Sequence, residues 1–157
     1  MIIETSELPR LAGKVAMVSG GFDPLHPGHI IYFRAAAELG FPLLCNVSND
    51  RFVAKKHAPL LLERERIDII DEFRCVTYTH LAREGTVEVL RLLRPALYVK
   101  GQDWAGRLPQ EELLACEESG ARVAFLDTVT NSSSGILERY TAAQGERAIR
   151  ALAEQRA

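Results

Sequence analysis

The chain has 157 residues, of which 47% are hydrophobic and 25% are charged, so it is long enough for one domain with a single core. This near-average composition excludes a disordered, collagen-like or coiled-coil protein. The formal net charge of −2 provides no global field for holding nucleic acid. No apolar run approaches the ~18 residues that span a bilayer, so we expect no membrane partner. Three widely spaced cysteines favour buried thiols in a cytoplasmic protein over disulfides.

Short apolar runs alternate with segments of helical period from residue 14 to about residue 140. The apolar runs predict five strands, at 15–18, 42–47, 75–79, 96–99 and 122–126. The segments between them predict helices, which are expected at 29–39, 63–73, 85–93 and 110–118. Strands that alternate with helices predict parallel pairing and right-handed crossovers. The expected fold class is therefore α/β: a doubly wound, Rossmann-like sheet of five parallel strands with a C-terminal helix.

Three regions follow from this pattern. Residues 1–13 form an N-terminal extension, residues 14–140 form the main domain, and residues 141–157 form a C-terminal helical tail. The terminal helix is expected at 135–157. It fits a docked helix, a dimer contact or a frayed tail equally well.

Ligands of an open α/β sheet bind beyond the carboxyl ends of its strands, where successive connections leave in opposite directions. This rule predicts that the functional residues follow the strands. The segments in question are 20–29, 49–56, 100–104 and 128–134.

The strongest single signal is the pair of histidines at the start of the first predicted helix. His26 and His29 are three residues apart, and Gly28 between them leaves room for a bulky anion at the positive helix N-terminus. Imidazole N–H donors there can neutralise charge that develops on a phosphoryl group. Upstream, Gly20 and Gly21 allow backbone N–H groups to approach a phosphate closely. A structural histidine or a zinc pair explains the pattern less well, because no third His or Cys ligand lies nearby in sequence.

Residues 21–29, which include Phe22 and Asp23, resemble the Gly-x-Phe-Asp-x-x-His-x-Gly-His motif of the cytidylyltransferase-like nucleotidyltransferases. The resemblance continues to about residue 140 through further segments in the family's order, at 62–66 with 73–76, at 98–104 and at 131–137. Within the family, these segments are most similar to those of heptose-1-phosphate adenylyltransferases and glycerol-3-phosphate cytidylyltransferases.

This resemblance implies nucleotidyl transfer. A phosphate oxygen of a small phosphorylated acceptor attacks the α-phosphorus of a nucleoside triphosphate, and pyrophosphate leaves. Because the attacking oxygen is already anionic, the protein mainly positions the substrates and neutralises charge. The resemblance assigns catalytic roles to His26, His29 and Lys56. It also implies Mg²⁺ bound with the triphosphate, no protein metal site, and a homodimer.

Several further residues match positions that bind the nucleotide in the family. Lys56 has the better spacing for reaching the triphosphate, and Lys55 is a close second, although a solvated basic pair is the simpler interpretation. Arg66 matches a phosphate-binding arginine rather than an ordinary surface charge. The serines before the last helix replace Ser-Thr-Thr and keep the hydroxyls, whether they bind phosphate or only cap the helix. The expected nucleotide-binding residues are Gly20, Gly21, Phe22, Asp23, Gly28, Lys55, Arg66, Lys100, Gly101, Asp103, Ser132, Ser133 and Ser134.

The preference for one nucleotide rests on the absence of a single arginine. The glycerol and choline enzymes carry an arginine shortly before the Ser-Thr-Thr segment, whereas residues 127–131 here contain none, which favours ATP over CTP. The acceptor is expected to be a sugar phosphate or an alditol phosphate. Alternatives are an adenylyltransferase acting on pantetheine phosphate or nicotinamide mononucleotide, and a non-catalytic nucleotide-binding module. A class I aminoacyl-tRNA synthetase fragment is excluded because the chain lacks a Lys-Met-Ser-Lys-Ser loop.

Overall fold

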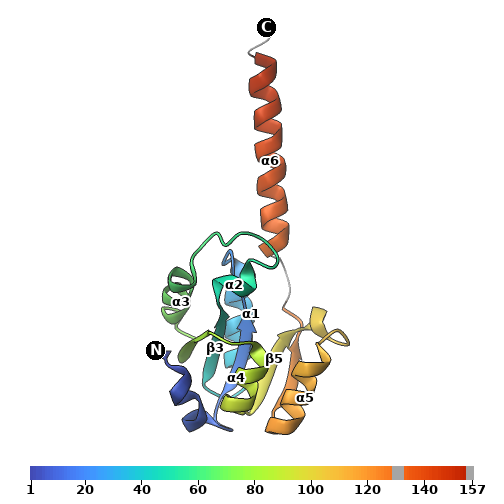
Figure 1. Ribbon diagram of the computed structural model, residues 1–157. Helices are drawn as coiled ribbons and strands as arrows, with labels where there is room; N and C mark the ends of the chain where they lie inside the picture. Colours follow the sequence, from blue (N-terminus) through green and yellow to red (C-terminus); the bar gives the residue numbers. More distant parts are fainter. Residues whose placement is uncertain (129–132, 155–157) are drawn as a thin grey trace.

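The computed structural model describes residues 1–128 and 133–154. Within these residues, six parallel strands form one sheet in the order β1-β4-β3-β2-β5-β6. Figure 1 shows strands of this sheet, with β3 and β5 labelled, together with the surrounding helices. The strands are β1 (Ile2–Ile3), β2 (Ala16–Gly20), β3 (Leu43–Ser48), β4 (Tyr78–Ala82), β5 (Leu97–Gly101) and β6 (Arg122–Leu126).

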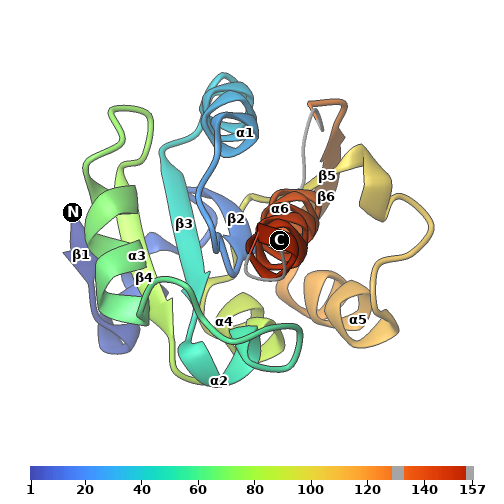
Figure 2. The same cartoon turned by 90° about the horizontal axis from the view of Figure 1, so that it is seen from above.

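Helices cover both faces of the sheet. They are α1 (Pro27–Ala37), α2 (Asp50–Val53), α3 (Glu63–Asp71), α4 (Thr86–Leu93), α5 (Gln110–Ser119) and α6 (Ser133–Glu154), with the 3₁₀ helices η1 (Thr5–Leu11) and η2 (Gln102–Trp104). One core cluster joins α1 and α3 to the sheet, and a second joins η1, α4 and α5 to the opposite face. Figure 2 shows α1 and α4 on opposite sides of the strands. The predicted doubly wound α/β class is confirmed.

The strand order creates a switch point between β2 and β5. From β2 the chain moves outward through β3 to β4, and it then crosses back to place β5 on the other side of β2. Connections leave β2 and β5 in opposite directions, which opens a crevice beyond their carboxyl ends. This crevice is where the candidate site lies.

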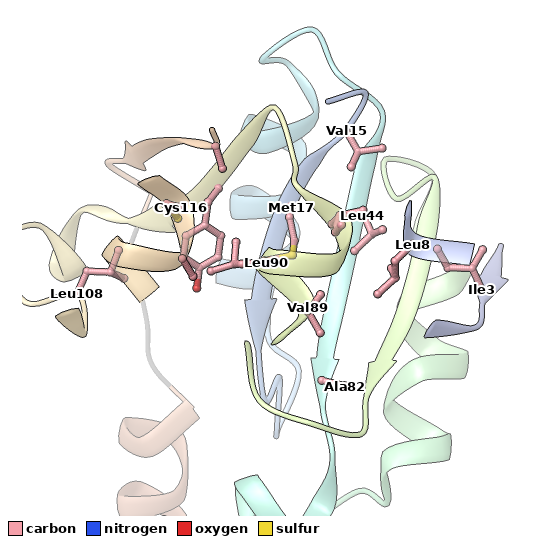
Figure 3. Close-up of a cluster of buried hydrophobic side chains, with 14 residues drawn as sticks. Ile3, Leu8, Val15, Met17, Leu44, Ala82, Val89, Leu90, Leu108 and Cys116 are labelled. Carbon is pink, nitrogen blue, oxygen red and sulfur yellow. The ribbon is translucent and has the colours of Figure 1, made fainter. Parts of the chain in front are cut away.

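The prediction of five strands is wrong, because the sheet has a sixth strand at its edge. Ile2 and Ile3 pair with Thr79 and His80 of β4. Two residues are too few to show the period-two pattern on which strand prediction depends. The segment predicted as an extension also contributes Leu8, which is fully buried in the core cluster of Figure 3.

The third strand begins three residues later than predicted. Residues 73–76 form a turn in which the Val76 N–H donates to the Phe73 carbonyl oxygen at 2.8 Å, and β4 starts only at Tyr78. The strand then continues through His80, which is 1% exposed. A polar side chain marks the end of an apolar run in sequence, but here it is buried beside another polar side chain, Asn46.

Helix α6 projects away from the body of the molecule (Figure 1). It begins two residues before the predicted start and runs without interruption past Gly145. Across residues 1–128 and 133–154, no helix has both the length and the apolar character needed to span a membrane.

The burial of Leu8 makes the N-terminal segment part of the folding unit. We expect Leu8→Ala to lower the free energy of unfolding by about 2–5 kcal/mol, because it leaves a cavity in the core. Leu92→Ala is the matched control, since this leucine is 43% exposed and its loss is expected to cost much less. Urea denaturation followed by circular dichroism measures both, and equal losses would contradict the prediction.

Candidate active site

A cavity of about 530 Å³ opens at the switch point, beyond the carboxyl ends of β2 and β5. This volume is in the range of small-ligand sites. Most of the residues predicted for the site line it. They are Gly20, Gly21, Phe22, Asp23, His26, Gly28, His29, Lys56, Lys100, Gly101, Asp103 and Ser133.

The two histidines are held by the backbone at the start of α1. The Gly28 N–H donates to Nδ1 of His26 at 3.1 Å, which makes His26 the N-cap of the helix. The His26 N–H in turn donates to Nδ1 of His29 at 3.3 Å. Because each Nδ1 accepts a hydrogen bond, the proton of each neutral ring is on Nε2. Both rings therefore carry a fixed N–H donor, and their centroids are only 3.8 Å apart.

Both histidines favour the neutral form. Burial lowers the pKa of His26, and burial together with the neighbouring His26 ring lowers the pKa of His29 to about 4. Charging one ring next to the other is unfavourable in a partly desolvated site. At neutral pH the pair therefore has hydrogen-bond donors without a full positive charge.

Phe22 fixes the His29 ring from the side of the core. Its own backbone is left-handed, with φ of 52°, which is strained for a bulky residue. The Phe22 ring packs edge-on against His29 at 5.2 Å and against Phe33 at 5.1 Å. A Cβ atom on Gly20 would lie 3.1 Å from that ring, so a larger residue there would force the Phe22 ring to shift by a few tenths of an ångström.

Asp23 contacts the loop that carries the predicted lysines, rather than presenting free oxygens to a ligand. Its carboxylate accepts hydrogen bonds from the N–H groups of Leu60 and Leu61, at 2.8 and 3.1 Å. Lys56, in the same loop, lines the cavity. The Lys55 ammonium instead lies 4.4 Å from the centroid of the Phe52 ring. Of the two lysines, the structure brings only Lys56 to the site.

The structure places Arg66 behind the wall of the cavity rather than at its surface. Arg66 is fully buried, and it does not line the cavity. Its guanidinium donates to the carbonyl oxygens of Gly21, Ser48 and Leu61 at 2.6–3.0 Å and to the Asp50 carboxylate at 2.6 Å. These partners satisfy a charge that would otherwise be costly to bury. Arg66 is a positioning residue that holds together the loops around the cavity.

The opposite wall is formed by β5, η2 and α5. Lys100 is 8% exposed, and its ammonium lies 4.2 Å from the centroid of the Trp104 ring. Burial lowers the pKa of Lys100, while the nearby carboxylates of Glu112 and Asp103 act in the opposite direction. Glu112 also accepts a hydrogen bond from the Tyr98 hydroxyl at 2.8 Å. This wall therefore combines an aromatic surface with groups of both charges.

One of the three predicted serines reaches the site in the described part of the chain. Ser133 begins α6, lines the cavity and donates a hydrogen bond to the Pro24 carbonyl oxygen at 3.0 Å. This bond ties the start of α6 to the histidine loop. Ser132 and the side chain of Ser134 lie outside the described part of the chain.

Several lining residues were not predicted. Ser19 and Thr86 lie at the end of β2 and at the start of α4, so the rule that places sites at the carboxyl ends of strands was the signal available for them. Glu112 has no such signal, because it reaches the cavity from the first turns of α5. Tyr32, Ser48 and His57 also line the cavity outside the predicted segments. Phe52, Val53, Trp104 and Thr128 lie within the predicted segments 49–56, 100–104 and 128–134, although none of them was assigned a binding role.

The fold and cavity define a doubly wound α/β protein with its ligand site at the switch point of the sheet. Residues 17–139 match the family model described as cytidylyltransferase-like. The chain therefore belongs to the cytidylyltransferase-like family.

The relatives agree with this membership. The chain is 34% identical over 144 residues to the bifunctional protein HldE of Syntrophotalea carbinolica. The match covers 85% of this chain and 29% of that protein. It is 29% identical over 123 residues to the FAD synthase of Methanocella paludicola, covering 75% of this chain and 88% of the relative. The chain thus spans less than a third of the HldE relative.

A solved structure also resembles this one. The lipopolysaccharide core biosynthesis protein from Thermoplasma volcanium superimposes with a TM-score of 0.65 and 25% identity. The match covers 74% of this chain and 98% of that protein.

Two histidines with lowered pKa values, His29 and His80, make stability depend on pH. The pKa is about 4 for both His29 and His80, mainly because of burial, whereas a histidine in an unfolded chain has a pKa of about 6.5. Between these values the unfolded state binds more protons, so the free energy of unfolding decreases as pH falls from 6.5 to 4. Urea denaturation at pH 7, 5.5 and 4.5 measures this. His29→Asn removes one of the two titrating groups, so the free energy of unfolding should depend less steeply on pH in this variant. Equal slopes for the variant and the wild type would contradict the prediction.

Proposed function

We propose that the protein transfers an NMP group from a nucleoside triphosphate, with ATP favoured, to a small phosphomonoester such as a sugar 1-phosphate, and releases pyrophosphate. The observation that carries this proposal is the pair of neutral imidazoles at the start of α1, each with its proton on Nε2 and each lining the cavity. A helix N-terminus with two fixed donors suits an anionic phosphoryl group.

In this proposal the triphosphate binds against the histidine pair. Charge that develops on the α-phosphoryl group is stabilised by the two N–H donors, which are already oriented before the reaction begins. The attacking oxygen is a phosphate oxygen, so no group of the protein is needed to remove a proton from it. The Lys56 ammonium lines the same cavity and would stabilise the leaving pyrophosphate.

Mg²⁺ is part of the same proposal. The ion prefers oxygen ligands and usually retains several waters, and the exposed Asp103 carboxylate that lines the cavity is an oxygen ligand of this kind. Asp103 and the phosphate oxygens would hold the ion. When bound, it neutralises part of the charge of the triphosphate.

Three observations support ATP and a sugar phosphate. Residues 127–131 lack the arginine that the family's glycerol and choline enzymes carry, and FAD, the product of one relative, contains an AMP group. A similar structure is that of a lipopolysaccharide core biosynthesis protein, which favours a saccharide acceptor. The alternative is a CTP-dependent transfer to glycerol phosphate or another alditol phosphate, which the Asp103–Trp104 segment favours through its resemblance to the glycerol enzymes.

The test is pyrophosphate release by the purified protein with Mg²⁺. ATP and CTP are tested separately against a panel of sugar and alditol phosphates. Release that requires ATP and a sugar 1-phosphate supports the proposal, and release with CTP and glycerol phosphate supports the alternative. Nucleotide binding without release over the whole panel would contradict both and would favour a non-catalytic nucleotide-binding module.

His29→Ala should lower kcat by about 10²–10³-fold, because it removes one donor to the transition state. His29→Asn keeps an amide donor at this position, and we expect it to retain more activity than the alanine variant. Steady-state kinetics of pyrophosphate release measures both variants. Full activity of His29→Ala would show that this ring has no part in the reaction.

A further inference from the structure

A row of hydrogen-bonded polar side chains crosses the sheet beneath the cavity. Ser19, Asn46 and His80 occupy equivalent positions on β2, β3 and β4, where Ser19 pairs with Asn46 and Asn46 pairs with His80. Thr5 of η1 and Thr86 of α4 complete this polar row at its two ends. Its central members, Asn46 and His80, are at most 1% exposed.

The hydrogen bonds of the polar row from Thr5 to Ser19 all run in the same donor-to-acceptor direction. His80 is neutral at pH 7 because burial lowers its pKa to about 4, so one ring nitrogen donates and the other accepts. Asn46 Nδ2 donates to Ser19 Oγ at 3.1 Å, so its Oδ1, which lies 2.8 Å from His80 Nδ1, must accept. The ring proton is therefore on Nδ1, and Nε2 accepts from the Thr5 hydroxyl at 3.0 Å. Every bond from Thr5 to Ser19 points toward the cavity.

This direction leaves a donor at the cavity. Ser19 Oγ accepts from Asn46, so its own hydrogen is available either to Thr86 Oγ1, 3.2 Å away, or to a ligand. The two hydroxyls have two hydrogens, and the bond between them uses only one. Both residues line the cavity, so the pair can donate one hydrogen bond to an acceptor atom placed there.

The hydroxyl groups of Ser19 and Thr86 approach the cavity from the face of the sheet opposite to the histidines. Val18 packs in the core cluster under α1, and the next residue of β2, Ser19, points to the opposite face of the sheet. Thr86 is the first residue of α4, which covers that opposite face. In-line displacement places the attacking and leaving oxygens on opposite sides of the phosphorus. Lys56 and Lys100 both line the cavity and are close enough for the Lys56 charge to lower the pKa of Lys100. A second anion at the hydroxyl pair would therefore have positive charge nearby.

We propose that Ser19 and Thr86 bind the phosphate of the acceptor, and that Asn46 is the positioning residue that holds Ser19 as a donor. This inference rests on the proposed function, because it names the second substrate's subsite in the same cavity. It also gives a reason for a buried Asn–His pair on a sheet face where the neighbouring core residues Met17, Leu44 and Ala82 are apolar.

The experiment measures phosphate and nucleotide binding separately. Inorganic phosphate is titrated by calorimetry into the full chain saturated with Mg²⁺ and the α,β-methylene analogue of ATP, which fills the triphosphate site without reacting. Ser19→Ala and Thr86→Val should each weaken phosphate binding roughly 10- to 100-fold, the range expected for losing a hydrogen bond to a charged group. The affinity for the analogue should stay unchanged.

Two controls separate binding from folding. Ser19→Thr keeps the hydroxyl and should bind phosphate as the wild type does. Thr141→Val removes a hydroxyl on α6 that donates only to the Leu137 carbonyl oxygen of its own helix in the described contacts, and it should change neither affinity. Urea denaturation of every variant verifies that each is folded at the temperature of the titration.

Three results would overturn the inference: no phosphate binding by the wild type, unchanged binding in both variants, or an equal loss of affinity for the analogue. Pyrophosphate release by the same samples tests the proposed function independently. If the variants lose phosphate binding selectively but the wild type transfers no NMP to any acceptor, the subsite is supported and the proposed reaction is wrong.

Discussion

The buried guanidinium of Arg66 is the interaction on which the shape of the candidate site depends. It donates to the carbonyl oxygen of Gly21, just after β2, and to that of Ser48, at the end of β3. Its remaining bonds reach Leu61 and Asp50, so one side chain joins the segments that surround one side of the cavity. Such a charge is tolerated in the interior because its donors are paired, and a replacement would leave several carbonyl oxygens without partners.

Residues of the histidine motif hydrogen-bond to the backbone of this protein as well as lining the cavity. His26 caps α1 by accepting a hydrogen bond from the Gly28 N–H at Nδ1. This bond leaves the ring proton on Nε2, where it can be donated to a ligand. Asp23 uses both carboxylate oxygens to hold the loop that carries Lys56. The chemistry of the site and the stability of its loops therefore depend on the same side chains, and a substitution at either position affects both.

The cavity is built from the two faces of one sheet. The histidine pair belongs to α1, whose core cluster is on one face, and Ser19, Thr86 and Lys100 approach from the other. A parallel sheet with a switch point produces this arrangement because helices on both faces begin near the same carboxyl edge. Two anionic substrates can then be held by separate sets of donors, with the reacting atoms between them.

The sequence by itself determined the strand–helix alternation, the doubly wound class and the segments of the site, because apolar periodicity and the carboxyl-edge rule are local or nearly local signals. It could not reveal β1, which is too short to show a period, nor the bounds of β4, which starts after a turn at 73–76 and continues through the buried His80. Only the tertiary structure decided that Arg66 is buried and that Lys55 does not line the cavity. Whether a charged side chain meets ligand, solvent or buried carbonyl oxygens depends on groups distant in the chain, and no spacing along the sequence contains that information.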